Sequence, residues 1–158
     1  MRKYLLLVSL LALPTAGFAA DSVSLTVSGN LYQPTACDVN ATSMTIAFGD
    51  ILSSSIDGAK NKKPLNVTVT CTNLNPIQNV NVQVTGTGTT TNKLPITGTA
   101  KGFQLALKKG TTDQNFGANI KVSSNGSLDL SLTPVIKTGE KFVTGAFSAS
   151  LTIKVIVT

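Results

Sequence analysis

Apolar and polar residues alternate along most of this chain. From Val23 to Leu31 the even positions carry serine, threonine and asparagine, and the odd positions carry Val23, Leu25, Val27, Gly29 and Leu31. This period of two predicts a strand with one dry face and one wet face. Glycine weakens the interior of a strand, so Gly29 in the dry row indicates a close approach by another backbone.

Six further segments alternate in the same way, and each is bounded by turn-forming residues. They cover residues 44–48, 65–71, 80–84, 103–107, 128–132 and 147–157. Residues 120–122 and 94–96 could add short strands, and residues 51–60 could hold one helical turn. No window has convincing helical periodicity, so the pattern predicts an all-β fold, most simply a sandwich of two sheets.

The first residues are predicted to be removed from the folded protein. Arg2 and Lys3 precede the apolar run YLLLVSLLAL, and small residues follow at Gly17 and Ala19. This is the pattern of a secretory signal peptide over residues 1–19, with cleavage after Ala19. The remaining residues, 20–158, are enough for one domain with its own core.

Composition argues against several functions. The net charge of +6 falls to +4 without Arg2 and Lys3, and no arginine, tryptophan or histidine then remains. Nucleic-acid surfaces usually need arginine and stacking aromatics, so no nucleic-acid partner is expected. Catalytic triads need histidine, and the carboxylates after the signal peptide are dispersed, so no enzyme and no cofactor are expected. These carboxylates include Asp38, Asp50, Asp57, Asp113, Asp129 and Glu140.

Cys37 and Cys71 are the two cysteines of the chain. An even cysteine count in an exported protein indicates a disulfide. Two thiols without any histidine are too few ligands for a metal site. A loop of about 35 residues closed by an unstrained disulfide stabilises the fold by about 3–4 kcal/mol.

Four of these features, in this order, resemble the chaperone–usher fimbrial (pilus) subunits. They are the alternating N-terminal segment with its central glycine, the cysteine pair in ACDV and VTVTC, the stretch GFQLALKKG, and the final segment GAFSASLTIKVIVT that Gly145 introduces. The resemblance extends over the whole chain that follows the signal peptide. The order and spacing of the four features together are more specific than any one of them.

The resemblance implies an incomplete immunoglobulin-like sandwich of six to seven strands, completed by a donor strand from another chain. Residues 20–33 would be the donor-strand extension, carrying Val23, Leu25, Val27, Gly29 and Leu31, and residues 34–158 the pilin domain. The groove that accepts the strand would flank the final segment at Gly145, Phe147, Ala149, Leu151, Ile153, Val155 and Val157. The implied function is that of a structural subunit of a surface fimbria, which polymerises by donor-strand exchange and supports adhesion.

The implied partners are identical or related pilus subunits, a periplasmic chaperone and an outer-membrane usher. The protein would be exported through the periplasm to a fimbrium on the bacterial cell surface. One alternative stays open from the residues alone. The segment from Val23 to Leu31 could fold back as the missing strand, and the chain would then be a self-complemented monomer, for example a carbohydrate-binding adhesin or a lectin-like secreted sandwich.

Overall fold

The computed structural model describes residues 24–40 and 46–158, and the chain divides at Leu31 into two units that are described separately. In the first unit, residues 24–31 form neither helix nor strand. Their apolar side chains are open to solvent, with Leu25 84%, Val27 85% and Leu31 100% exposed. The strand predicted there is therefore absent from residues 24–31, and Val23 lies outside the described residues.

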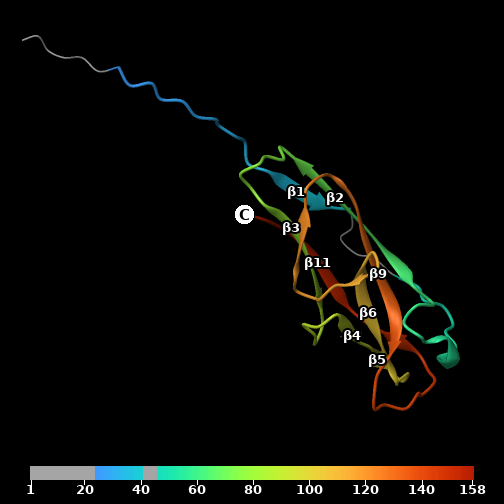
Figure 1. The fold of residues 1–158 in the computed structure, drawn as a ribbon. Helices are drawn as coiled ribbons and strands as arrows, with labels where there is room; N and C mark the ends of the chain where they lie inside the picture. The colour runs from blue at the N-terminus through green and yellow to red at the C-terminus, as the bar shows by residue number, and fades with distance from the viewer. Residues whose placement is uncertain (1–23, 41–45) are drawn as a thin grey trace, which may run out of the picture. The chain divides into compact units, whose positions relative to one another are not determined.

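The second unit, residues 32–158, contains one large antiparallel sheet (Figure 1). Its strands lie in the order β1 (Ala36–Val39), β2 (Lys63–Thr72), β9 (Gly126–Ile136), β6 (Phe103–Lys109) and β4 (Lys93–Pro95), and β7 (Thr112–Asp113) pairs with β6. Long strands stand at the centre of this sheet, and β9 has five consecutive buried residues, 130–134. The strand β1 is an edge strand, because it pairs with β2 alone among the described strands.

Two smaller sheets complete the second unit. One has the order β11 (Leu151–Val157), β3 (Val80–Gly86) and β8 (Asn119–Val122), and the other pairs β10 (Phe147–Ser148) with β5 (Thr97–Gly98). Every strand pairing is antiparallel. A single 3-10 turn, η1 (Ser53–Ser55), falls inside the segment where one helical turn was expected. Among the residues described, no helix has the length and apolar character needed to cross a membrane.

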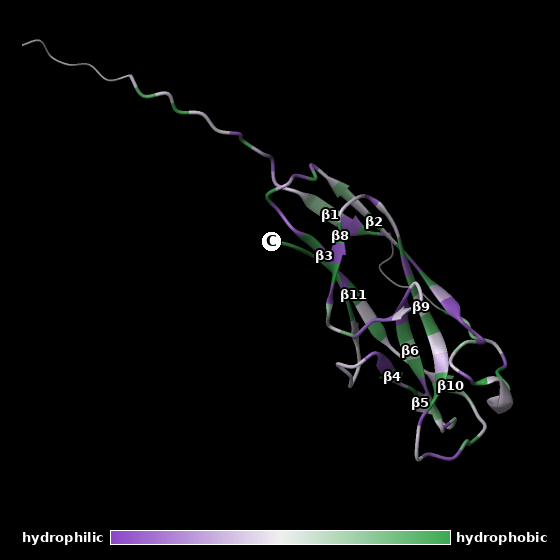
Figure 2. Ribbon diagram, in the orientation of Figure 1, coloured by the Kyte–Doolittle hydropathy of each residue, from purple (hydrophilic) through white to green (hydrophobic). Residues whose placement is uncertain are grey.

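The core lies between the large sheet and the sheet of β3, β8 and β11. Its side chains come from alternate positions of the strands, as in Leu65, Val67 and Val69 of β2 and Val82 and Val84 of β3. Apolar stretches along β6 and β9 appear green in Figure 2. Alternation at a period of two places these side chains on one face of each strand, which is why the sequence pattern predicts the strands correctly here.

Cys37 and Cys71 form the predicted disulfide. They stand directly opposite one another in the pairing of β1 with β2. The bond therefore attaches the short edge strand β1 to the long strand β2, which belongs to the core.

Three further predicted strands differ from the structure. Residues 46–48 of the segment predicted over 44–48 are irregular, and residues 44 and 45 lie outside the described part. The segment 147–157 is two strands, because β10 pairs with β5 and the chain then changes partner at Ala149–Ser150 so that β11 pairs with β3. The strand predicted over 128–132 continues through Pro134 to Ile136. The pairing of β9 with β2 ends at Leu132, so among the described strands Pro134 has no neighbour on the β2 side. Proline is tolerated where a strand has lost one neighbour.

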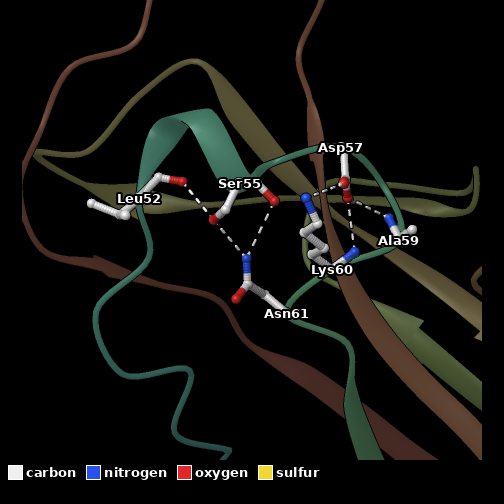
Figure 3. Close-up of polar contacts among 6 residues, drawn as sticks. All are labelled: Leu52, Ser55, Asp57, Ala59, Lys60 and Asn61. Carbon is white, nitrogen blue, oxygen red and sulfur yellow. Dashed lines mark hydrogen bonds and ion pairs between the residues drawn. The ribbon is translucent and has the colours of Figure 1, made fainter.

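Short polar contacts fix the loop that carries η1 (Figure 3). The Ser55 hydroxyl donates to the Leu52 carbonyl at 2.7 Å, and the Asn61 amide donates to the Ser55 hydroxyl at 2.9 Å. The Asp57 carboxylate accepts from the backbone N–H groups of Ala59, at 2.9 Å, and Lys60, at 2.8 Å. These bonds use the turn chemistry of serine, asparagine and aspartate, so the loop has a defined conformation without regular structure.

Candidate functional site

The last strand, β11, has one free edge. Among the described residues it pairs with β3 alone. Thr158 exchanges two backbone hydrogen bonds with Asn79, at 2.9 and 2.7 Å, and the Ser150 carbonyl accepts from Thr87. Antiparallel pairs alternate between bonded and non-bonded positions, so the even residues of this segment bond to β3. The N–H and C=O groups of the odd residues, from Leu151 to Val157, therefore point toward the free edge.

An apolar groove of about 800 Å³ lies beside this edge. One wall is formed by residues 145–153, and the opposite wall by residues 46–50 together with Val39 and Asn40. The floor is made by core side chains of the large sheet, namely Leu65, Val67, Leu94, Leu105 and Leu132. A groove with an apolar floor and an unpaired strand edge can bind an extended segment that supplies both apolar side chains and backbone hydrogen bonds.

Phenylalanine side chains join the two walls. The ring centroids of Phe48 and Phe147 lie 6.0 Å apart, and Phe147 packs edge-on against Phe103 at 5.0 Å. These separations are within the range in which aromatic rings attract one another. Phe103 belongs to the core, so the contact also anchors the wall that carries Phe147.

The predicted groove residues fall into two groups. Gly145, Phe147, Ala149, Leu151 and Ile153 line the groove. The remaining two, Val155 and Val157, are half-buried and pack against the core beyond the lining. Their shared role as the binding surface for a strand stays a prediction.

The wall at residues 46–50 was not recognised as part of the site from the sequence. Its apolar residues Ile46 and Phe48 are half-buried, and they alternate with exposed positions. The sequence carried this signal, since the alternation marked residues 44–48 as two-faced. The alternation alone does not predict that the apolar face of these residues lines a groove and that their backbone is not paired as a strand.

Gly145 stands at the rim of the groove and leaves no room for a side chain. A Cβ atom there would collide with the Thr99 hydroxyl, and the backbone has φ +150°, a value that L-residues rarely adopt. The Ala146 N–H donates to the Thr99 hydroxyl at 3.1 Å, and the Ala146 carbonyl accepts from Thr99 and Ala100, at 3.0 and 3.1 Å. These bonds fix the rim before the chain enters β10.

Three carboxylates form ion pairs with lysines at the surface of the described chain. Asp57, Asp113 and Glu140 each form an ion pair with one lysine, at 3.5, 3.3 and 2.7 Å. Hydrogen bonds from the backbone N–H groups of Lys60 and Ala59 lower the pKa of Asp57, and the charge of Lys60 adds to this effect. In the part of the chain that the structure describes, no three potential metal ligands gather. The groove itself is lined mainly by apolar side chains and by the backbone of residues 145–153.

Comparisons with known proteins identify the family of the chain and agree with its fold. A model of the family described as Fimbrial protein matches residues 24–158. Curated protein sequences give no match. The chain is similar to the P pilus rod subunit PapA in its crystal structure, with 17% identity and a TM-score of 0.53 over 84% of this chain and 98% of that chain. It is also similar to a subunit in the structure of a chaperone–usher pilus solved to explain rod uncoiling, with 17% identity and a TM-score of 0.56 over 91% of this chain and 99% of that chain. At this identity the likeness shows the fold alone, and it confirms the predicted all-β, immunoglobulin-like sandwich.

Proposed function

This chain belongs to the fimbrial protein family and is a structural subunit of a pilus, and we propose that its groove binds the N-terminal extension of a second subunit. The extension comprises residues 20–33, and one subunit would donate it to the groove beside β11 of the next. The observation that carries the proposal is the free edge of β11 above an apolar groove. A head-to-tail contact of this kind does not close on itself and so builds a fibre.

The extension has the pattern that such a groove requires. Its apolar side chains recur at every second residue, and those of Leu25, Val27 and Leu31 are exposed in the described chain. Paired with β11, the extension would place them on the groove floor while its backbone bonds to the free N–H and C=O groups. Burying these three and Val23 is worth roughly 1.5–3 kcal/mol each, a gross gain of roughly 6–12 kcal/mol before ordering costs.

Gly29 would lie where the bound strand approaches the groove most closely. A Cβ atom at this position meets nothing within 4 Å in the subunit itself. Its lack of a side chain is therefore not required by the subunit's own packing. A close approach of backbones in the docked state would explain why glycine interrupts the row of apolar residues in the extension.

An apolar groove with an open strand edge must be covered before assembly, because such an edge promotes aggregation. We propose that a periplasmic chaperone covers it by lending a strand, and that the exchange for a subunit extension takes place at an outer-membrane usher. The finished fibre would stand on the bacterial surface and support adhesion. The proposed role is structural and uses no catalytic group.

A comparison of two versions of the chain from a periplasm lacking the chaperone tests the proposal. One is the chain from residue 20 to 158. In the other, residues 20–33 are moved behind Thr158 through a flexible linker. We expect only the second to be a soluble monomer with a high Tm. The matched control carries Leu25→Ser and Val27→Ser in the moved segment and should lose most of that gain. An equally stable monomer from the first version would instead establish a self-complemented fold.

A further inference from the structure

The chain that leads from the extension into the sandwich is bound to the loop of residues 73–78. The side-chain amide of Asn75 donates to the Gln33 carbonyl at 2.9 Å, to the Thr35 hydroxyl at 3.1 Å and to the Gln78 side-chain oxygen at 2.9 Å. The Thr35 N–H donates to the same Gln78 oxygen at 2.8 Å. We call residues 33–35 the root of the extension. These bonds attach the root to the loop.

This loop also presents apolar side chains to solvent. Ile77 is 68% exposed and Leu74 is 41% exposed. The loop is held in place, since the Gln78 N–H donates to the Asn75 side-chain oxygen at 3.1 Å in addition to the bonds to the root. Contiguous exposed apolar surface marks interaction sites, and Leu74 and Ile77 are the apolar side chains that this loop offers to such a surface.

A second fixed loop with exposed apolar side chains leads to the rim of the groove. Val143 is 50% exposed and Phe142 is 41% exposed. The backbone of Val143 exchanges two hydrogen bonds with Lys101, at 3.2 and 3.0 Å, so its position is fixed. Gly145, which lines the groove, follows two residues later.

The two loops lie at opposite ends of β11. Asn79 follows the first loop and pairs with Thr158, just beyond the last residue of the strand. Phe142 and Val143 come nine and eight residues before Leu151, the first residue of β11, and β10 lies between them and that strand. A strand of seven residues is about 23 Å long. The loop of residues 73–78 therefore lies at the C-terminal end of β11, and the loop with Phe142 and Val143 lies at the N-terminal end.

The direction of the donated strand decides which end of the acceptor the donor subunit approaches. Every strand pairing in this sandwich is antiparallel, and antiparallel pairing is the slightly more stable kind. A donor segment antiparallel to β11 has its last apolar residue, Leu31, near the start of β11. From Leu31 to Gln33 the chain spans at most about 7 Å. The loop bound to Gln33 must then lie against the acceptor's end that carries Phe142 and Val143.

We propose that Leu74 and Ile77 of one subunit pack against Phe142 and Val143 of the adjacent copy, forming an end-to-end contact around the donated strand. This inference rests on the proposed function, since the donated strand brings the two ends together. The contact would bury the apolar side chains that both fixed loops leave open. It would also set how far one subunit can tilt relative to the next.

Cysteine cross-linking in assembled fibres tests the contact. The full chain carrying Ile77→Cys and Val143→Cys is assembled, oxidised and run on a denaturing gel without reductant, and fibres are viewed by electron microscopy. We expect fibres and a ladder of covalent multimers that reductant dissolves. The single variants Ile77→Cys and Val143→Cys are the matched controls and should give no ladder. A covalent dimer from Ile77→Cys alone would show that the loops of residues 73–78 of two subunits meet. A donor strand parallel to β11 requires that contact, so this result would overturn the proposal.

Fibres without a ladder would overturn the end-to-end contact and leave the proposed groove function intact. A failure of the unmodified chain to form fibres would overturn both. A second comparison needs no cysteine. Fibres of Ile77→Lys with Val143→Lys should dissociate at least roughly tenfold faster than fibres of Ile77→Lys with Val143→Glu, because like charges meet in the first and opposite charges in the second. Equal rates would overturn the contact.

Discussion

Loss of the Cys37–Cys71 disulfide should destabilise the subunit and also weaken its groove. The bond closes a loop with a sequence separation of 34 residues. The loop-entropy relation then gives a stabilisation of about 3.8 kcal/mol. For a domain of roughly 125 residues the entropy of unfolding is about 0.26 kcal/mol per kelvin, so the expected fall in Tm is about 15 °C.

The effect on the groove follows from the position of β1. This strand is only four residues long, pairs with β2 alone among the described strands, and ends at Val39, which lines the groove. Without the disulfide, β1 keeps its backbone pairing, the partial burial of Val39 and the hydrogen bonds of the adjacent Asn40 to β2, but it loses its covalent link to that core strand. We therefore expect the bound extension to dissociate more readily from the variant Cys37→Ser with Cys71→Ser than from the oxidised parent.

The assay is urea unfolding of the version with residues 20–33 moved behind Thr158, with and without the two serine substitutions. Reduced parent protein is the matched control, because it lacks the bond and keeps both sulfur atoms. We expect both forms without the bond to lose about 3–4 kcal/mol in the free energy of unfolding. A loss below about 1 kcal/mol, or a loss in the serine variant but not in the reduced parent, would refute the argument from loop entropy.

Three further outcomes are expected. Gly29→Val should leave unfolding of the sandwich unchanged but weaken strand docking by about 1–3 kcal/mol, because overpacking arises only in the groove, and fibre yield measures this. Gly145→Ala should lower the free energy of unfolding by about 1–3 kcal/mol, because the new methyl group meets the Thr99 hydroxyl and φ is positive; a thermal melt with an unchanged Tm would contradict it. NMR titration should find the pKa of Asp57 below its ordinary value of about 3.9. Because the folded pKa is lowered, this carboxylate stabilises the fold above its unfolded pKa and loses that effect as the pH falls through the folded pKa, a dependence that Asp57→Asn should remove.

Most central strands could be predicted from alternation because burial of one face imposes a period of two. This holds for β2, β3 and β6, whose dry positions enter the core. Alternation identifies the dry side chains but not the partner of the backbone. For that reason residues 147–157 were predicted as one strand, although the chain changes partner from β5 to β3 within them.

The candidate site could be predicted on one side only. The wall from Gly145 to Ile153 follows from the final alternating segment, and the structure places those odd residues on the groove. The opposite wall is irregular backbone, so no period marks it as part of a site. The contact between Phe48 and Phe147 joins residues about a hundred positions apart, and such a pairing depends on tertiary packing that local sequence does not encode.

The free edge of β11 and the alternating extension belong to the same chain, and this gives the proposed fibre a polarity. In a row of such subunits every internal groove is filled and every internal extension is used. One vacant groove remains at one tip and one unused extension at the other, whatever the length. Growth at each tip therefore needs a different binding activity, and a single molecule per fibre that fills the vacant groove without offering a groove of its own would stop elongation at that tip.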